Sequence, residues 1–192
     1  MLDILLLGPQ GSGKGTQAKR ISEAYGIPHI ATGDILRSAM AHGTELGRRV
    51  KPIYDSGGLV PDDLMIQIIR ERLAGDDAES GFILDGFPRT LPQAEALDPM
   101  LREIGKELTV EFALQLPEQV SVERLLNRAQ LEGRLDDTPE AIRNRLALYR
   151  RETEPLVEWY RIRSKVVPIH AERTPNEVFA EIQQALEQAA VA

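Results

Sequence analysis

Short apolar runs alternate along the chain with longer stretches of helical periodicity. Five runs are bounded by turn residues and are short enough for buried strands: 4–7, 28–31, 82–84, 110–116 and 166–169. Apolar residues recur with helical spacing in the segments between and after them, at 16–25, 64–73, 91–104, 120–130 and 141–163. Strands and helices therefore alternate, which predicts an α/β fold with a mainly parallel sheet flanked by helices.

The last helix has a clear start signal. Thr174 and Glu177 have the spacing of a capping box, and Pro175 stands between them at the first helical position. Apolar residues then recur through Val178 and Leu186, which predicts a helix over this segment. The acidic stretch 75–79, by contrast, predicts a solvated loop.

Composition indicates one soluble domain. The chain has 192 residues with a net charge of −7 and 42% hydrophobic residues, enough for a single core without a disulfide or metal staple. Cysteine is absent, which fits a reducing, cytoplasmic location. We expect no signal peptide, because the N-terminal apolar run is short and no basic region precedes it. We also expect no membrane partner, because no apolar run approaches roughly 20 residues. The acidic balance also argues against a nucleic-acid partner.

A glycine-rich loop directly follows the first predicted strand. Residues 8–16 read Gly-Pro-Gln-Gly-Ser-Gly-Lys-Gly-Thr, and a helical pattern comes next. This order is typical of a phosphate-binding P-loop, in which backbone N–H groups surround phosphate oxygens and Lys14 reaches the terminal phosphates. Gly15 stands where the general motif has a Mg²⁺-binding hydroxyl, so we expect Mg²⁺ to be held by water and phosphates. The predicted phosphate-binding residues are Gly11, Ser12, Gly13, Lys14, Gly15 and Thr16.

Four further motifs follow in order along the chain. They read Ala31-Thr32-Gly33-Asp34-Ile35-Leu36-Arg37, Gly57-Gly58-Leu59-Val60-Pro61-Asp62, Asp85-Gly86-Phe87-Pro88-Arg89-Thr90 with Gln93, and Gly133-Arg134-Leu135-Asp136-Asp137 with Arg145. On these motifs the sequence resembles the nucleoside monophosphate kinases, and among them the adenylate kinases. The loop with Gly15 matches that family's variant of the P-loop, and the resemblance covers nearly the whole chain.

The resemblance implies a P-loop NTPase-type kinase domain over 1–192. Its core would comprise 1–30, 61–126 and 138–192, with a monophosphate-binding insertion at 31–60 and a lid at 127–137. Only five residues separate Arg128 from Arg134, where long-form members insert a small β domain that often binds zinc. We therefore expect a short-lid form without zinc.

The resemblance also implies a reaction. It is the reversible, Mg²⁺-dependent transfer of a phosphoryl group from ATP to AMP, giving two ADP, by a monomer. Two alternatives stay open: a kinase acting on UMP, CMP or another monophosphate, and a P-loop nucleotide-binding switch or NTPase. Thr32 and Thr90 favour AMP, since pyrimidine kinases of the family tend to carry Ala and Asn there. A second set of arginines, which a switch does not need, counts against the last alternative.

Residue roles are carried over only at matching positions. The implied catalytic residues are Lys14, Asp85, Arg89, Arg128, Arg134 and Arg145, with Asp85 reaching Mg²⁺ through water and no direct protein ligand to the metal. On the ATP side the resemblance adds Arg124, Arg128 and, more weakly, Arg173. On the AMP side it gives Thr32, Arg37, Gly58, Leu59, Val60, Gly86, Phe87, Pro88, Arg89, Gln93, Arg134 and Arg145. His29, His42 and His170 are interpreted as structural or surface residues.

Overall fold

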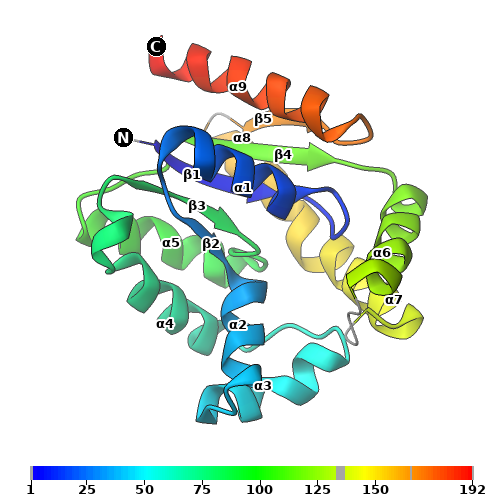
Figure 1. The fold of residues 1–192 in the computed structure, drawn as a ribbon. Coiled ribbons are helices and arrows are strands. Elements are labelled where there is room, and N and C mark those ends of the chain that lie inside the picture. The colour runs from blue at the N-terminus through cyan, green and yellow to red at the C-terminus, as the bar shows by residue number, and fades with distance from the viewer. Residues whose placement is uncertain (1, 133–136, 165, 192) are drawn as a thin grey trace.

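The computed structural model describes residues 2–132, 137–164 and 166–191, and is built on one parallel sheet (Figure 1). The strand order is β2-β3-β1-β4-β5, so the first strand lies in the centre. The α/β class with a parallel sheet is thereby confirmed. The strands are β1 (Leu2–Leu7), β2 (His29–Ala31), β3 (Gly81–Asp85), β4 (Val110–Gln115) and β5 (Val166–His170).

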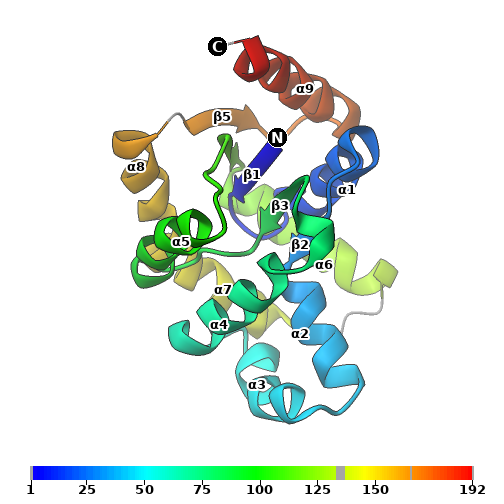
Figure 2. The ribbon, with the colours of Figure 1, turned by 90° about the vertical axis from the view of Figure 1, so that its left-hand side faces the viewer.

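Helices cover both faces of this sheet. In Figure 2, α1 (Lys14–Tyr25) and α9 (Pro175–Val191) lie to the right of the strands, with α5 (Leu91–Glu103) and α8 (Glu154–Arg163) to the left. The central strand shows the consequence: Ile4 and Leu6 belong to the core shared with α1 and α9, and Leu5 and Leu7 to the core on the other face. A parallel strand that is buried on both faces is expected to be a continuous apolar run, and residues 4–7 form such a run.

Two helices of the segment 31–60 extend away from the sheet. They are α2 (Thr32–Ala41) and α3 (Glu45–Asp55), at the bottom of Figures 1 and 2, followed by α4 (Asp62–Leu73). The apolar pattern did not predict α2 and α3. Their buried residues are few, since only Thr32, Leu36, Gly47 and Val50 are buried.

The segment 141–163 is not the single helix that its periodicity predicts. It is divided into α7 (Pro139–Leu148), a π turn (Tyr149–Thr153) and α8. Pro155 lies in the first turn of α8, where it cannot donate to the preceding turn. Thr153 lies at the end of the π turn, and its hydroxyl donates to the backbone oxygen of Arg89 at 2.8 Å. The interruption thus supports a residue of the predicted site.

The remaining elements agree with their sequence signals. Thr174 N donates to Glu177 Oε2 at 3.0 Å and Glu177 N donates to Thr174 Oγ1 at 3.4 Å, so the predicted capping box starts α9. The acidic stretch forms a short 3₁₀ turn (Asp76–Ala78). The helix α6 (Glu118–Glu132) packs on α7 through Leu125, Ile142 and Leu146. Within the ranges that the structure describes, no helix is both long enough and apolar enough to cross a membrane.

Candidate active site

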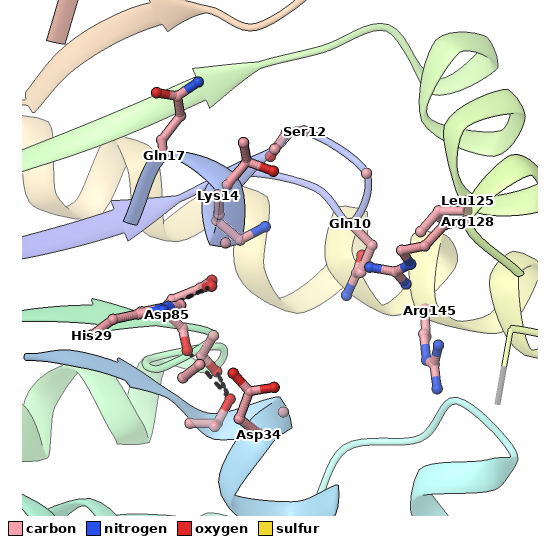
Figure 3. Close-up of a pocket in the computed structure, with 18 of the residues that line it drawn as sticks. Gln10, Ser12, Lys14, Gln17, His29, Asp34, Asp85, Leu125, Arg128 and Arg145 are labelled. Atoms are coloured by element: carbon pink, nitrogen blue, oxygen red, sulfur yellow. Dashed lines mark hydrogen bonds and ion pairs between the residues drawn. The ribbon is translucent and has the colours of Figure 1, made fainter. Parts of the chain in front are cut away.

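A cavity of about 760 Å³ opens at the carboxyl ends of the central strands, where ligands bind in sheets of this kind (Figure 3). The P-loop after β1 and the end of β3 form its floor. Residues of α2, the end of α3 and the segment 58–60 line one side. Residues of α6, α7 and the start of α9 line the other. Segments more than 100 residues apart in sequence therefore meet around one space.

The P-loop takes a backbone path that requires glycine. Gly8 has φ +144°, and a Cβ there would lie 2.7 Å from the backbone oxygen of Leu114. The ammonium group of Lys14 donates to the carbonyls of Gly8 at 2.7 Å and Pro9 at 2.9 Å. Burial lowers the pKa of Lys14 to about 8, and the nearby charge of Asp85 opposes part of that shift. Lys14 is thus held at the mouth of the loop as a group that gains from an anionic ligand.

Asp85 ends β3 beside the P-loop, as expected from the sequence. Its Oδ2 lies 3.7 Å from the position of a Cβ on Gly15, and His29 Nε2 lies 3.2 Å from the same oxygen. Burial alone would raise the pKa of Asp85, but the His29 hydrogen bond and the charge of Lys14 outweigh it and keep that pKa below its usual value. The carboxylate therefore stays ionised at neutral pH. His29 was missed as a site residue, because a single histidine at a strand end carries no spacing signal.

A group of arginines lies on the side of the cavity formed by the segment 31–60. Arg89 Nε donates to the carbonyl of Gly86 at 2.7 Å. Arg37 donates to Asp34 and to the hydroxyl of Tyr54. Burial lowers the pKa of Arg89, with Asp85 opposing the shift. These cations lie opposite the P-loop and give the cavity a second place for a phosphate.

The predicted base-binding residues are held by a network behind these arginines. Gln93 Oε1 accepts from Arg89 N at 2.8 Å, and Gln93 Nε2 donates to Asp62 Oδ1 at 2.7 Å. The hydroxyl of Thr90 donates to the same carboxylate oxygen at 2.8 Å. One N–H and one lone pair of the Gln93 amide remain available for a ligand, since an amide has two of each. Thr32 donates to the backbone oxygen of Gly86 at 3.1 Å.

A buried carboxylate holds two arginines of the opposite wall. Asp137 accepts from Arg128 Nε at 2.8 Å and from Arg145 Nη1 at 2.7 Å, and its side chain is fully buried. Arg145 also donates to the backbone oxygen of Tyr54 at 3.2 Å and lies over that ring. Arg145 therefore connects this wall to the segment 31–60. Arg134, predicted for the same wall, lies outside the described residues.

The start of α9 and Arg124 bound the cavity beyond the P-loop. Arg124 donates to the carbonyl of Ala171 at 2.9 Å and lines the cavity. The carbonyl of Pro175 accepts from Gln17 at 3.0 Å and from Arg20 at 2.6 Å, which joins α9 to α1. Arg173 lines the same end and pairs with Glu181.

The structure brings most of the predicted residues to the walls of one cavity. The exceptions among described residues are Phe87, which is buried in the apolar core, and Pro88 beside it. Gln10, Gln17, His29 and Tyr54 line the cavity without having been predicted. A P-loop that faces a second set of arginines across one cavity defines a nucleotide-binding phosphotransferase of the P-loop class.

Comparison with known proteins gives the family. The family model described as adenylate kinase matches residues 6–165. This chain belongs to the adenylate kinase family, and it is thus an enzyme of the nucleoside monophosphate kinase type. An adenylate kinase of Thermus thermophilus is 50% identical over 183 residues, 95% of this chain and 96% of the relative. Adenylate kinases of Cyanothece sp. and Archaeoglobus fulgidus are 46% and 42% identical, over 98% and 97% of this chain and 96% and 98% of the relatives.

Proposed function

We propose that this protein transfers the terminal phosphoryl group of ATP to AMP, giving two ADP. The observation that supports this most directly is the pairing of two cationic ends in one cavity. The P-loop with Lys14 forms one end, and Arg37 with Arg89 forms the other. Two polyanions can approach each other only where both charges are neutralised, and a cavity with cations at both ends provides that.

Each end suits one nucleotide. On the ATP side, backbone N–H groups of 11–16 bind the phosphates, Lys14 reaches the terminal ones, and the adenine lies between Arg124 and the start of α9. On the AMP side, Arg37 and Arg89 bind the monophosphate. The available groups of Gln93, with Thr32 and the segment 58–60, surround the base. Gly86 adds backbone to that pocket, whereas Phe87 and Pro88 support it from behind the wall.

The phosphoryl group moves between the two ends in line. Arg128, Arg145 and, from the sequence, Arg134 stabilise the charge that spreads over the phosphoryl oxygens. Because the AMP oxygen is already an anion, no general base and no covalent enzyme intermediate are needed. Closure of the walls around both nucleotides excludes the water that would otherwise hydrolyse ATP.

The residues at the P-loop fit a magnesium ion carried by ATP. Asp85 is an ionised carboxylate at the loop, with one oxygen near His29. The other oxygen accepts no hydrogen bond from a described residue and can accept one from a metal-bound water. Thr16 lies in the same wall. Within 2–132, 137–164 and 166–191, no group of three His, Asp or Glu side chains could hold a metal by itself. When bound with ATP, Mg²⁺ neutralises part of the phosphate charge.

AMP is proposed over other acceptors because of the network behind Arg89. Asp62 fixes both Thr90 and Gln93, which orients the Gln93 amide toward the cavity. A purine with an amino group can use one donor and one acceptor of that amide together. The direct test is a coupled assay of ADP formation with ATP and a panel of nucleoside monophosphates. AMP should be preferred, and ATP should not be turned over without an acceptor.

The monomeric, cytoplasmic state is part of the same proposal. The described residues that we propose contact the nucleotides surround one cavity, which supports a site that works within a single copy. The lack of cysteine agrees with a reducing compartment. Light scattering of the purified protein tests the monomer, and fractionation of expressing cells tests the location.

A further inference from the structure

Gln10 is a polar side chain of the P-loop to which no role has been given. It occupies a position between Gly8 and Lys14 that the loop motif leaves open. Its backbone oxygen accepts a hydrogen bond from the hydroxyl of Ser121 on α6. The next residue, Gly11, approaches α6 so closely that a Cβ there would lie 2.9 Å from the backbone oxygen of Ser121. The loop is therefore anchored at Gln10, which fixes where its side chain can go.

The side chain enters the cavity. Gln10 is part of the cavity wall, together with Lys14, Arg128 and Arg145. Figure 3 shows its amide extending from the P-loop into the same region as the Arg128 guanidinium, with Arg145 beyond it. This is the region between the ammonium group of Lys14 and the arginine wall, where the terminal phosphate of ATP has to lie for transfer.

The amide oxygen of Gln10 has no hydrogen-bond partner among the described residues. This Oε1 atom is also buried. Leaving such an oxygen unpaired is unfavourable, so its retention calls for a donor that becomes available when the ligand binds. The amide nitrogen likewise makes no hydrogen bond to any described residue.

A donor for that oxygen is close at hand. Arg128 uses Nε and Nη2 on Asp137, so within the described ranges its Nη1 has no partner. The Nη1 group can therefore donate to Gln10 Oε1. With the oxygen turned toward Arg128, the amide nitrogen and its two N–H groups turn toward the P-loop phosphates.

We propose that Gln10 is a further catalytic residue of the phosphoryl transfer. Its amide nitrogen donates a hydrogen bond to an oxygen of the phosphoryl group in transfer, and its amide oxygen accepts from Arg128. A neutral donor at this point stabilises the oxygens without adding another cation beside Lys14. The inference rests on the proposed function, because it assigns one contact within that reaction.

The test compares two substitutions of similar size. Gln10→Met keeps the length of the side chain and removes both hydrogen bonds. Gln10→Glu keeps the shape and the acceptor for Arg128, but it replaces the donor by a negative charge that repels phosphate. Gln119→Glu, at an exposed position on α6, is the matched control for the added charge.

The readout is the rate of ADP formation in a single turnover, so that product release does not mask the transfer step. We expect Gln10→Met to lower this rate about 10- to 100-fold, and Gln10→Glu to lower it further. The KM for AMP should stay close to that of the parent. The melting temperature of the free Gln10→Met protein should not fall, because the substitution removes a buried oxygen that has no hydrogen-bond partner in the described chain. Gln119→Glu should behave as the parent in every measurement.

Three outcomes would overturn the inference. One is a single-turnover rate within about twofold of the parent for both Gln10 variants. Another is a Gln10→Glu rate above that of Gln10→Met, because shape would then be what matters. The third is a change in the KM for ATP alone, which would make Gln10 a ground-state contact. The parent decides the proposed function separately: if it forms ADP from ATP and AMP, that function stands even when the Gln10 inference fails.

Discussion

Arg128 and Arg145 are joined through one buried carboxylate, with Asp137 Oδ2 accepting from Arg128 at 2.8 Å and Oδ1 accepting from Arg145 at 2.7 Å. The two cations come from α6 and α7, so the carboxylate fixes the relative position of two helices as well as of two proposed catalytic groups. It also offsets the repulsion between neighbouring positive charges. Stability and catalysis therefore depend on the same side chain.

Asp137→Asn should lower both the stability of the protein and its catalytic rate. Loss of the charge weakens two charge-assisted hydrogen bonds at a fully buried position, so we expect the free energy of unfolding to fall by about 1–3 kcal/mol. Urea denaturation measures it. Asp77→Asn is the control, because Asp77 pairs with Arg72 at an exposed site and should change the midpoint little. Equal midpoints for Asp137→Asn and the parent would contradict a structural role for Asp137.

Lys14→Met should abolish most of the transfer without unfolding the protein. Among the described residues, the Lys14 ammonium group donates to loop carbonyls alone, and Lys14 is not part of the apolar core. Removing this preorganised charge should lower kcat at least about a hundredfold. The coupled assay measures the loss, and circular dichroism checks the fold. Lys51→Met, at an exposed lysine paired with Asp55, should leave kcat unchanged. A folded Lys14→Met variant with normal turnover would remove the P-loop from the mechanism.

The pKa of Lys14 predicts how ATP binding depends on pH. Without ligand that pKa is about 8 instead of 10.5, because burial disfavours the charged form. Bound phosphates favour the charged form and raise the pKa again. ATP affinity should then be fully present below pH 8 and decline as the pH rises above it. Near pH 8.5, binding should take up a proton.

Calorimetry in two buffers of different ionisation enthalpy measures this proton uptake. Lys14→Met serves as the control, since it has no amine to protonate and should show no uptake in the same range. An ATP affinity that is flat from pH 7 to pH 9.5 would contradict the shifted pKa.

Gln93→Ala should weaken the binding of AMP more than the binding of ATP. The substitution removes the amide that we propose binds the base and leaves polar groups unpaired, at a cost of about 1–3 kcal/mol or roughly 5- to 150-fold in affinity. Titration with each nucleotide measures the difference, and the ATP affinity is the internal control. Equal losses for both nucleotides would show that Gln93 supports the site as a whole. Equal use of UMP and AMP by the parent would favour the alternative acceptor.

Chelation should separate catalysis from folding. Without Mg²⁺ the phosphate charges are less neutralised, so ADP formation should stop and return when Mg²⁺ is restored. The melting temperature of the free protein should not move, because no structural metal is expected. A mimic that joins two adenosines through a phosphate chain should raise the melting temperature, because it binds the folded protein. A fall in melting temperature with chelator alone would indicate a metal that stabilises the fold.

Periodicity predicted the parts of the fold that are buried on the sheet. All five strands were located within about two residues, because each is a short run between turn residues. The helices α2 and α3 were not predicted from the sequence. Few of their residues are buried, and their apolar residues join a core to which several elements contribute. The break at Pro155 was missed as well, because the apolar spacing continues across it.

The site was predictable where residues form motifs and obscure where they act singly. The P-loop, the motif at 85–89 and Arg145 lie in recognisable contexts, and the structure places them on one cavity except for Phe87 and Pro88, which lie behind its wall. His29 and Gln10 became visible only through their surroundings: a carboxylate 3.2 Å away for His29, and a buried, unpaired oxygen for Gln10. Neither kind of information is present in a linear sequence.

The central place of β1 has a consequence for biosynthesis. The register pairs Leu2 with Gly81 and Ile4 with Val110, so β1 is made before both of its neighbours and lacks the second of them until more than half of the chain has been made. Its apolar residues must wait in an unpaired strand, the kind of surface that chaperones bind. Because such distant pairings also slow folding, the nucleotide site should be among the last features of the nascent protein to form.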